Sequence, residues 1–208
     1  MKKSTVTYTV GIYLFDEIEV LDFAGPFEVF STASRVKLRL EPNTAKPFEV
    51  ITIAESIRTI RTRGDLLVQP HTDIQHHPHI DVLVIPGGVV SAELQREAVI
   101  DWIARTASSS TITASVCTGA FLLGRAGLLR GMSATTHWED IADLRSMFPD
   151  VDVQTKRRWV DMGRVVTSAG ISAGIDMSLH IVSRLESQEL AIRTAKQMEF
   201  DWQNLSND

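Results

Sequence analysis

The chain has 208 residues, of which 44% are hydrophobic and 23% charged, and this composition is typical of a soluble globular protein. Its formal net charge of −5 argues against non-specific binding of nucleic acid, which usually requires a basic surface. The single cysteine cannot form an internal disulfide, and neither a signal peptide nor a membrane-spanning segment is recognisable. We therefore expect a cytoplasmic protein that binds neither nucleic acid nor membranes.

Apolar strands alternate with helices along the chain. The first half predicts strands at 6–15, 47–54 and 81–85, helices from Pro26 to about Ser34 and at 94–107, and a hairpin or extended arm at 57–70. The second half predicts a strand and a helix on either side of Cys117, a strand at 133–136, helices at 138–147, 170–185 and 189–202, and paired strands at 151–160 and 164–168. This alternation is typical of a doubly wound α/β sandwich with a mostly parallel sheet, and no linker interrupts the single domain 1–208.

The most informative segment surrounds Cys117. A β-branched, apolar run stops at the cysteine, and two small residues, Ser115 and Gly119, lie two positions to either side. This pattern is typical of a nucleophile on a sharp turn between a strand and a helix. The positive end of that helix would lower the pKa of the thiol and favour the thiolate at neutral pH. The alternative is a small, buried hydrophobic residue without chemistry.

Two further features could serve such a nucleophile. Gly87 and Gly88 follow an apolar strand, so they form either a plain tight turn or, with the N–H of Thr118, a site that stabilises an anion. Asp22 lies within an otherwise apolar run, where a carboxylate is costly unless it is paired, solvated or protonated. It is therefore either the N-cap of the next helix or a general acid/base with a raised pKa that faces the thiol.

The histidines allow more than one interpretation. His137 either starts the helix at 138–147 or lies near Cys117. Four others lie in a segment with two prolines and lack the spacing of a helical ligand pair: His71, His76, His77 and His79. We expect loop histidines there rather than a metal site, and we assign no role to His180. No P-loop or dinucleotide-binding glycine motif is present, and no cofactor is predicted.

Six motifs, in this order, resemble the DJ-1/PfpI superfamily over nearly the whole chain. They are 11–15, 21–26 (LDFAGP), 85–88 (IPGG), 115–120 (SVCTGA), 134–138 (ATTHW) and 167–176. The resemblance implies a flavodoxin-like α/β sandwich, similar to class I glutamine amidotransferases, that forms a homodimer and carries its cysteine at the nucleophile elbow. It also implies that the substrate site includes Gly87, Gly88, His137, Gly170 and Ile171.

Within the superfamily, the sequence resembles the branch that contains isocyanide hydratase. The carboxylate of the first motif is Asp22, where other members usually place a glutamate, and Thr118 follows the cysteine, where protease-like members carry a histidine. The missing histidine argues against amide hydrolysis and makes Asp22 the better proton carrier. The resemblance implies that the Cys117 thiolate attacks a small organic isocyanide and forms a thioimidate, with Asp22 as acid/base and Thr118 holding substrate and water.

The motifs around 160–161 and 167–170 resemble equally the N-terminal domain of some AraC-type regulators. Those regulators carry a DNA-binding region after this domain, and we expect none here, in keeping with the acidic charge. A ligand- or redox-sensing module, with Cys117 as the oxidisable group, is therefore an alternative to an enzyme. Glyoxalase-like hydration of small dicarbonyls is a weaker alternative.

Overall fold

The computed structural model describes residues 6–202, and its centre is a seven-stranded sheet in the order β10-β11-β7-β6-β1-β2-β5. All neighbours in the sheet are parallel except β10 and β11. The strands are β1 (Tyr8–Leu14), β2 (Phe48–Ala54), β5 (Thr72–Asp73), β6 (Val82–Ile85), β7 (Ile112–Val116), β10 (Trp159–Asp161) and β11 (Val165–Ser168). Two short pairs lie apart from it: the hairpin of β3 (Ile60–Arg61) and β4 (Leu67–Val68), and the parallel pair of β8 (Ser133–Ala134) and β9 (Asp152–Val153).

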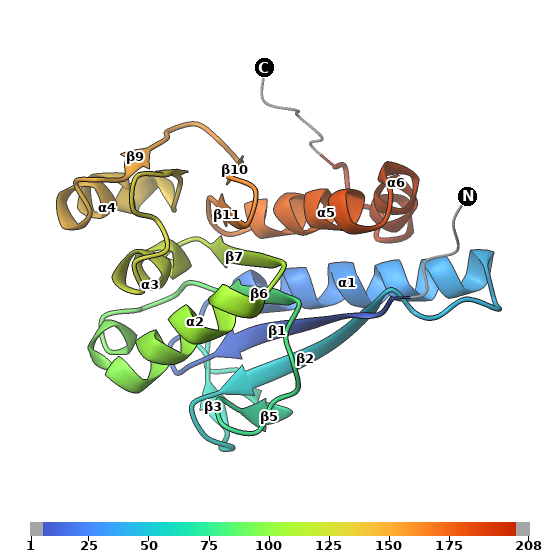
Figure 1. The fold of residues 1–208 in the computed structure, drawn as a ribbon, viewed down its shortest axis with the longest axis horizontal. Helices are drawn as coiled ribbons and strands as arrows, with labels where there is room; N and C mark the ends of the chain where they lie inside the picture. The colour runs from blue at the N-terminus through green and yellow to red at the C-terminus, as the bar shows by residue number, and fades with distance from the viewer. Residues whose placement is uncertain (1–5, 203–208) are drawn as a thin grey trace.

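Helices cover both faces of the sheet (Figure 1). On one face, α1 (Val20–Leu40), α5 (Ala173–Leu185) and α6 (Gln188–Gln197) contact one another. On the other, α2 (Glu97–Ser109) contacts α3 (Gly119–Arg125), while α4 (Ile141–Met147) packs beside β9. The predicted α/β sandwich is therefore confirmed. No helix within residues 6–202 is long and apolar enough to cross a membrane.

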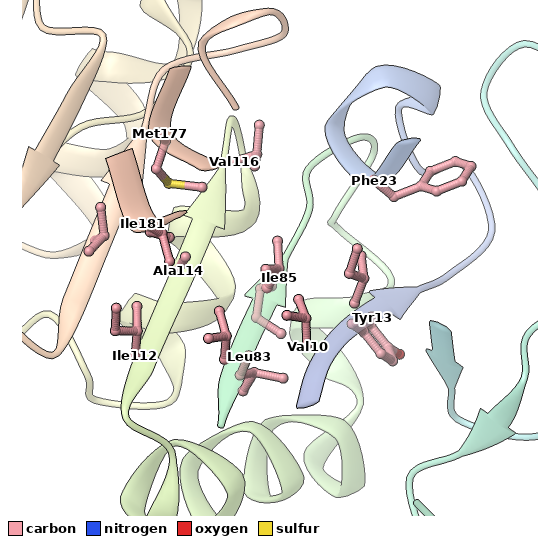
Figure 2. Packing of buried hydrophobic residues seen from close by; sticks show 14 of the residues in the cluster. Val10, Tyr13, Phe23, Leu83, Ile85, Ile112, Ala114, Val116, Met177 and Ile181 are labelled. Carbon is pink, nitrogen blue, oxygen red and sulfur yellow. The ribbon is translucent and has the colours of Figure 1, made fainter. Parts of the chain in front are cut away.

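The core lies along the central strands, which are covered on both faces. Figure 2 shows Leu83 of β6 and Ala114 of β7 on adjacent strands, with Met177 and Ile181 of α5 beside β7, and all four are fully buried. Nearly continuous apolar strands of this kind are typical of parallel sheets. Because β6 and β7 run side by side, the glycine turn after β6 and Cys117 after β7 lie at the same edge of the sheet.

The first helix differs from the helix predicted at 26–34. α1 spans 21 residues with Glu19 as its N-cap, so the interpretation of Asp22 as an N-cap is wrong. Asp22 instead lies in the first turn, and Pro26 lies inside the helix. Because proline has no N–H, the carbonyl of Asp22 lacks the helical hydrogen bond that residue 26 would otherwise donate.

Other differences concern element boundaries. The helix predicted at 94–107 is interrupted at Arg96, which has φ −90° and ψ 86°, so a 3₁₀ helix η1 (Glu93–Gln95) precedes α2. The helix predicted at 138–147 begins likewise as the 3₁₀ helix η2 (Trp138–Asp140) and continues as α4. The strand predicted at 151–160 is wrong as one element, because 152–153 pairs with β8 and only 159–161 pairs with β11. The last helix ends at Gln197 rather than at 202, and β5 has no counterpart among the predicted strands.

Candidate active site around Cys117

Cys117 occupies the sharp turn between β7 and α3. Its φ of 56° lies in the left-handed region, which costs backbone energy in a residue other than glycine and often marks functional sites. The Cys117 N–H donates a hydrogen bond to the Ser168 carbonyl at 3.1 Å, which ties the turn to β11. Gly119 allows the turn to approach β6, because a Cβ there would lie 2.1 Å from the Ile85 carbonyl oxygen. The turn therefore has the geometry of a nucleophile elbow.

Asp22 is fully buried and faces the cysteine. Its Oδ2 accepts a hydrogen bond from the Gly87 N–H at 3.1 Å, whereas its Oδ1 has no hydrogen-bond partner among the described residues. Burial raises the pKa of this carboxyl group to about 7, against smaller lowering effects of the Gly87 N–H and the Cys117 thiol. A carboxyl group that titrates near neutrality can both accept and donate a proton at that pH.

The expected lowering of the thiol pKa is wrong. Burial and, next, the negative charge of Asp22 raise the pKa of Cys117 to about 12, while the N–H of Thr118 acts weakly in the opposite direction. Cys117 is only 7% exposed, so little water is available to stabilise a thiolate. The resting cysteine is therefore a neutral thiol, and the group that titrates near pH 7 is its neighbour Asp22.

The glycine turn also differs from the expectation. The Gly87 N–H is bonded to Asp22, and the Gly88 N–H is bonded to the hydroxyl oxygen of Thr118 at 2.9 Å. That hydroxyl in turn donates a hydrogen bond to the Gly88 carbonyl oxygen at 2.9 Å. The two glycine N–H groups therefore do not point into the site as anion donors; instead they fix Asp22 and the elbow in place.

His137 lies beside the site without a hydrogen bond to the cysteine in the described residues. Its Nδ1 is 3.5 Å from a carboxylate oxygen of Asp140 and accepts a long, 3.4 Å hydrogen bond from the Glu139 N–H. Gly170 lies against both side chains, because a Cβ there would lie 2.6 Å from His137 Cδ2 and 2.9 Å from Cys117 Sγ. His137 thus forms part of the wall of the site, whereas the Asp22 carboxyl group interacts with the thiol itself.

The thiol opens into a cavity of about 250 Å³. The cavity brings together five of the predicted residues: Gly88, Cys117, Thr118, His137 and Ile171. It also contains Glu19, Arg63, Val89, Glu139 and Asp140, which sequence reasoning did not place there. For Glu139 and Asp140 the available signal was their position two and three residues after His137. Arg63 lies at the β3–β4 hairpin, and no sequence signal relates that hairpin to the site.

The remaining histidines have local partners. The Nδ1 of His71 contacts the Thr52 hydroxyl at 2.7 Å, and the Nδ1 of His76 contacts the Asp73 carboxylate at 2.8 Å. The Nε2 of His77 accepts a hydrogen bond from the indole N–H of Trp102 at 2.7 Å. Within residues 6–202, no three histidine, cysteine or acidic side chains are grouped so that they could hold a metal ion.

The chain is thus an α/β protein with a doubly wound sheet, an elbow cysteine at the carboxyl edge of that sheet and a buried carboxyl group beside it. The model of the DJ-1/PfpI family matches residues 8–184, and the chain belongs to that family.

Of two curated relatives, one is named as an enzyme and the other as a transcriptional regulator. The isonitrile hydratase of Pseudomonas putida is 30% identical over 193 residues, which cover 92% of this chain and 78% of the relative. The HTH-type transcriptional regulator GbdR of Pseudomonas aeruginosa is 28% identical over 184 residues, which cover 88% of this chain but only 48% of the regulator. The chain thus spans about half the length of that regulator.

Solved structures show the same fold. A ThiJ/PfpI family protein from Pseudomonas syringae superimposes with a TM-score of 0.82 at 25% identity, covering 95% of this chain and 76% of the other. Drosophila melanogaster DJ-1beta gives a TM-score of 0.79 at 18% identity, covering 95% of this chain and all of the other (100%). An AraC family transcriptional regulator from Pseudomonas putida gives 0.73 at 20% identity, covering 92% and 99%.

Proposed function

We propose that the protein is an enzyme similar to isonitrile hydratase, which hydrates an isocyanide, R–N≡C, to an N-formamide, R–NH–CHO. The observation that carries the proposal is the buried Asp22 carboxyl group, with a pKa of about 7, next to the Cys117 thiol. The 30% identity to the isonitrile hydratase of Pseudomonas putida supports it, as does Thr118 after the cysteine, where a histidine would favour amide hydrolysis.

In the first step, Cys117 Sγ bonds to the terminal carbon of the isocyanide while its proton passes to the Asp22 carboxylate. Asp22 then delivers that proton to the same carbon, which would otherwise carry a negative charge. The product is a neutral thioimidate, Cys–S–CH=N–R, and Asp22 is ionised again. Because the pKa of Cys117 is about 12, the thiol is not ionised before the substrate binds. The proton transfer to Asp22 therefore generates the nucleophile during the attack.

In the second step, Asp22 accepts a proton from a water whose oxygen bonds to the thioimidate carbon, and the nitrogen takes that proton. The C–S bond then breaks, the hydroxyl proton returns through Asp22 to the sulfur, and the N-formamide leaves. The buried Oδ1 of Asp22 has no hydrogen-bond partner among the described residues, and in this proposal it accepts the proton of the water. Every proton moves through one carboxyl group, so the reaction needs neither a metal nor an organic cofactor.

The direct test offers p-nitrophenyl isocyanide to the wild type and measures the formamide by chromatography. We expect turnover, with kcat/KM rising through an apparent pKa near 7 because Asp22 must be ionised to accept the thiol proton. Cys117→Ala is expected to abolish turnover, and Asp22→Asn to reduce it by about 10²- to 10⁴-fold. Asp16→Asn is the matched control, since Asp16 lies in an ion pair with Arg58 outside the cavity, and it should retain turnover. A wild type without turnover, or an active Cys117→Ala, would contradict the proposal.

A second candidate is a ligand-binding module, favoured by the similarity to the N-terminal part of GbdR over 88% of this chain. Redox sensing through Cys117 is disfavoured by its raised pKa and small exposure, because oxidation needs an accessible thiolate. Intact mass after mild peroxide treatment decides this point: a rapidly oxidised Cys117 would favour the sensor.

The homodimer implied by the family resemblance is also part of the proposal. Leu21 and Ile171, at the start of α1 and beside the site, are each more than a third exposed in the single chain, which a second copy could cover. Sedimentation equilibrium is the measurement, and a monomer at all concentrations would contradict it.

A further inference from the structure

A second cavity, of about 470 Å³, adjoins the site and has no place in the mechanism above. It lies between the segment after β6, α3 and α4, and its apolar lining consists of Val89, Val90, Leu94, Phe121 and Met147. Figure 1 shows α3 and α4 as neighbours on the side of the sheet away from α6. The cavity is large enough to fall in the range usual for small-molecule sites, about 300–1,000 Å³.

The two cavities are adjacent. Gly88, Val89, Thr118 and Asp140 line both the catalytic cavity and the apolar cavity. Thr118 directly follows the nucleophile, and its hydroxyl is held by the two hydrogen bonds to Gly88, so the shared wall is rigidly attached to the elbow. A substituent of a molecule that reacts at Cys117 would have to pass Thr118 to reach the apolar cavity.

The charged side chains that line the two cavities are mostly acidic. Asp140 and Asp143 line the apolar cavity, which has no lysine or arginine in its lining. The cavity at Cys117 is also lined by Glu19 and Glu139. Arg63 lines the same cavity, and its Nη1 lies 3.7 Å from Oε2 of Glu19. Partial burial raises the pKa of Asp140, whose side chain is 33% exposed. A further negative charge placed in this environment would be repelled.

We propose that the cavity lined by Val89, Leu94, Phe121 and Met147 holds the organic substituent of the molecule that reacts at Cys117, and that Asp140 and Asp143 exclude negatively charged substituents. The substrates are thus hydrophobic, with an aliphatic or aryl group of several carbons, and neutral or positively charged. The proposal rests on the proposed function only in that the reacting group is an isocyanide; the cavity would select the same substituent for any reagent of the thiol.

The experiment measures two reactions at Cys117. The first is turnover of methyl isocyanide, n-hexyl isocyanide and 6-isocyanohexanoate, given as kcat/KM. The second is alkylation by iodoacetamide, N-hexyl iodoacetamide and 6-(iodoacetamido)hexanoate at pH 9, followed by intact mass. Both hexyl compounds are expected to react at least about tenfold faster than the compounds with a terminal carboxylate, because they bury methylene groups without bringing a charge beside Asp140.

Two variants test the lining. Met147, which is 51% exposed, can be replaced without disturbing the core, and Met147→Trp should slow both hexyl reagents about tenfold while iodoacetamide keeps its rate. Asp143→Lys should speed the carboxylate reagents several-fold. The matched controls are Ile192→Trp, at a 52% exposed position on α6, and Asp101→Lys, at an exposed position on α2; both should leave all rates unchanged.

The outcomes separate the two proposals. Alkylation that prefers the hexyl reagent, without turnover of any isocyanide, would support the cavity and overturn the proposed function. Isocyanide turnover with equal rates for all three substituents, or with Met147→Trp unchanged, would overturn the cavity assignment and leave the proposed function standing.

Discussion

Two aspartates are fully buried near the starts of α1 and α5, yet their surroundings differ. The carboxylate of Asp176 forms an ion pair with Arg158, whose Nε lies 2.6 Å from Oδ2. Asp22 has no ion-pair partner among residues 6–202; a backbone N–H and a thiol are its polar neighbours. A charge balanced by a guanidinium holds structure in place, whereas an unbalanced carboxyl group keeps its proton available for exchange.

The two regions are connected through the segment that precedes α5. Arg158 also donates a hydrogen bond to the Ser172 hydroxyl at 3.3 Å. Gly170, two residues before Ser172, lies against Cys117. The balanced pair therefore positions the wall of the site, while the unbalanced carboxyl group takes part in the proposed chemistry. Substitution of each member should separate these roles.

The largest expected effect is a pH-dependent gain of stability in Asp22→Asn. The carboxyl pKa is about 7 in the folded protein and 3.8 in the reference state, so the folded state retains the proton longer. Wild-type stability therefore falls as pH rises from about 4 to 7, and the asparagine variant lacks this loss. The free energy of unfolding by urea should differ between the two by an amount that grows to about 4 kcal/mol at pH 8. A difference that is independent of pH would show that Asp22 does not titrate as proposed.

Asp176→Asn should have the opposite sign. Removal of one partner leaves the Arg158 charge without its counterion, and because Arg158 is about a third exposed we expect a loss of about 2–3 kcal/mol, below the range for a fully buried pair. Urea unfolding at pH 7 measures it, with Asp152→Asn as the control at an exposed aspartate. Equal stability of Asp176→Asn and wild type would remove the contrast between the two aspartates.

Gly170→Ala should reduce reactivity more than stability. The added Cβ would meet His137 Cδ2 at 2.6 Å and Cys117 Sγ at 2.9 Å, so either the sulfur or the histidine must shift. A displacement of that size is expected to lower isocyanide turnover about 10- to 100-fold, while the melting temperature changes by only a few degrees. Gly64→Ala, at a glycine with open space around it and without a left-handed backbone, is a control for the substitution itself. Unchanged turnover would show that Gly170 does not define the position of the thiol.

The smallest expected effect concerns the thiol. The charge of Asp22 is the second cause of the raised pKa of Cys117, after burial, so Asp22→Asn should lower that pKa by about one unit and leave it above its ordinary value. The pH dependence of iodoacetamide alkylation reports the shift. A thiol pKa that rises in the variant would mean that hydrogen bonding to Asp22 outweighs its charge.

The central part of the fold could be predicted because each strand carries its own signal. The apolar runs at 81–85 and 111–116 predict buried parallel strands, and the small residues around Cys117 predict the turn that follows. The boundaries of the helices and strands were harder to predict. Pro26 indicates the first turn of a helix, but tertiary packing extends α1 by six residues before it.

The residues that form the site could be predicted better than the pKa values of those residues. Asp22 stands out because a carboxylate interrupts an apolar run, but a sequence does not give the depth of burial that sets the pKa of both Asp22 and Cys117. The glycine N–H groups after β6 looked available until the structure showed their bonds to Asp22 and Thr118. Gly87 and Asp22 are 65 positions apart and Gly88 and Thr118 are 30 positions apart, so no local sequence pattern indicates these contacts.

The left-handed backbone at Cys117 has a consequence for engineering. Strain of this kind costs about 1–3 kcal/mol, and at this elbow it coincides with an uncompensated carboxyl group. A screen for thermostability alone would therefore favour glycine at 117 and asparagine at 22, and each gain would remove a group on which the proposed chemistry depends. Directed evolution of this scaffold would need selection for the proposed activity in every round, because the strained backbone and the unbalanced carboxyl group both lie at the proposed site.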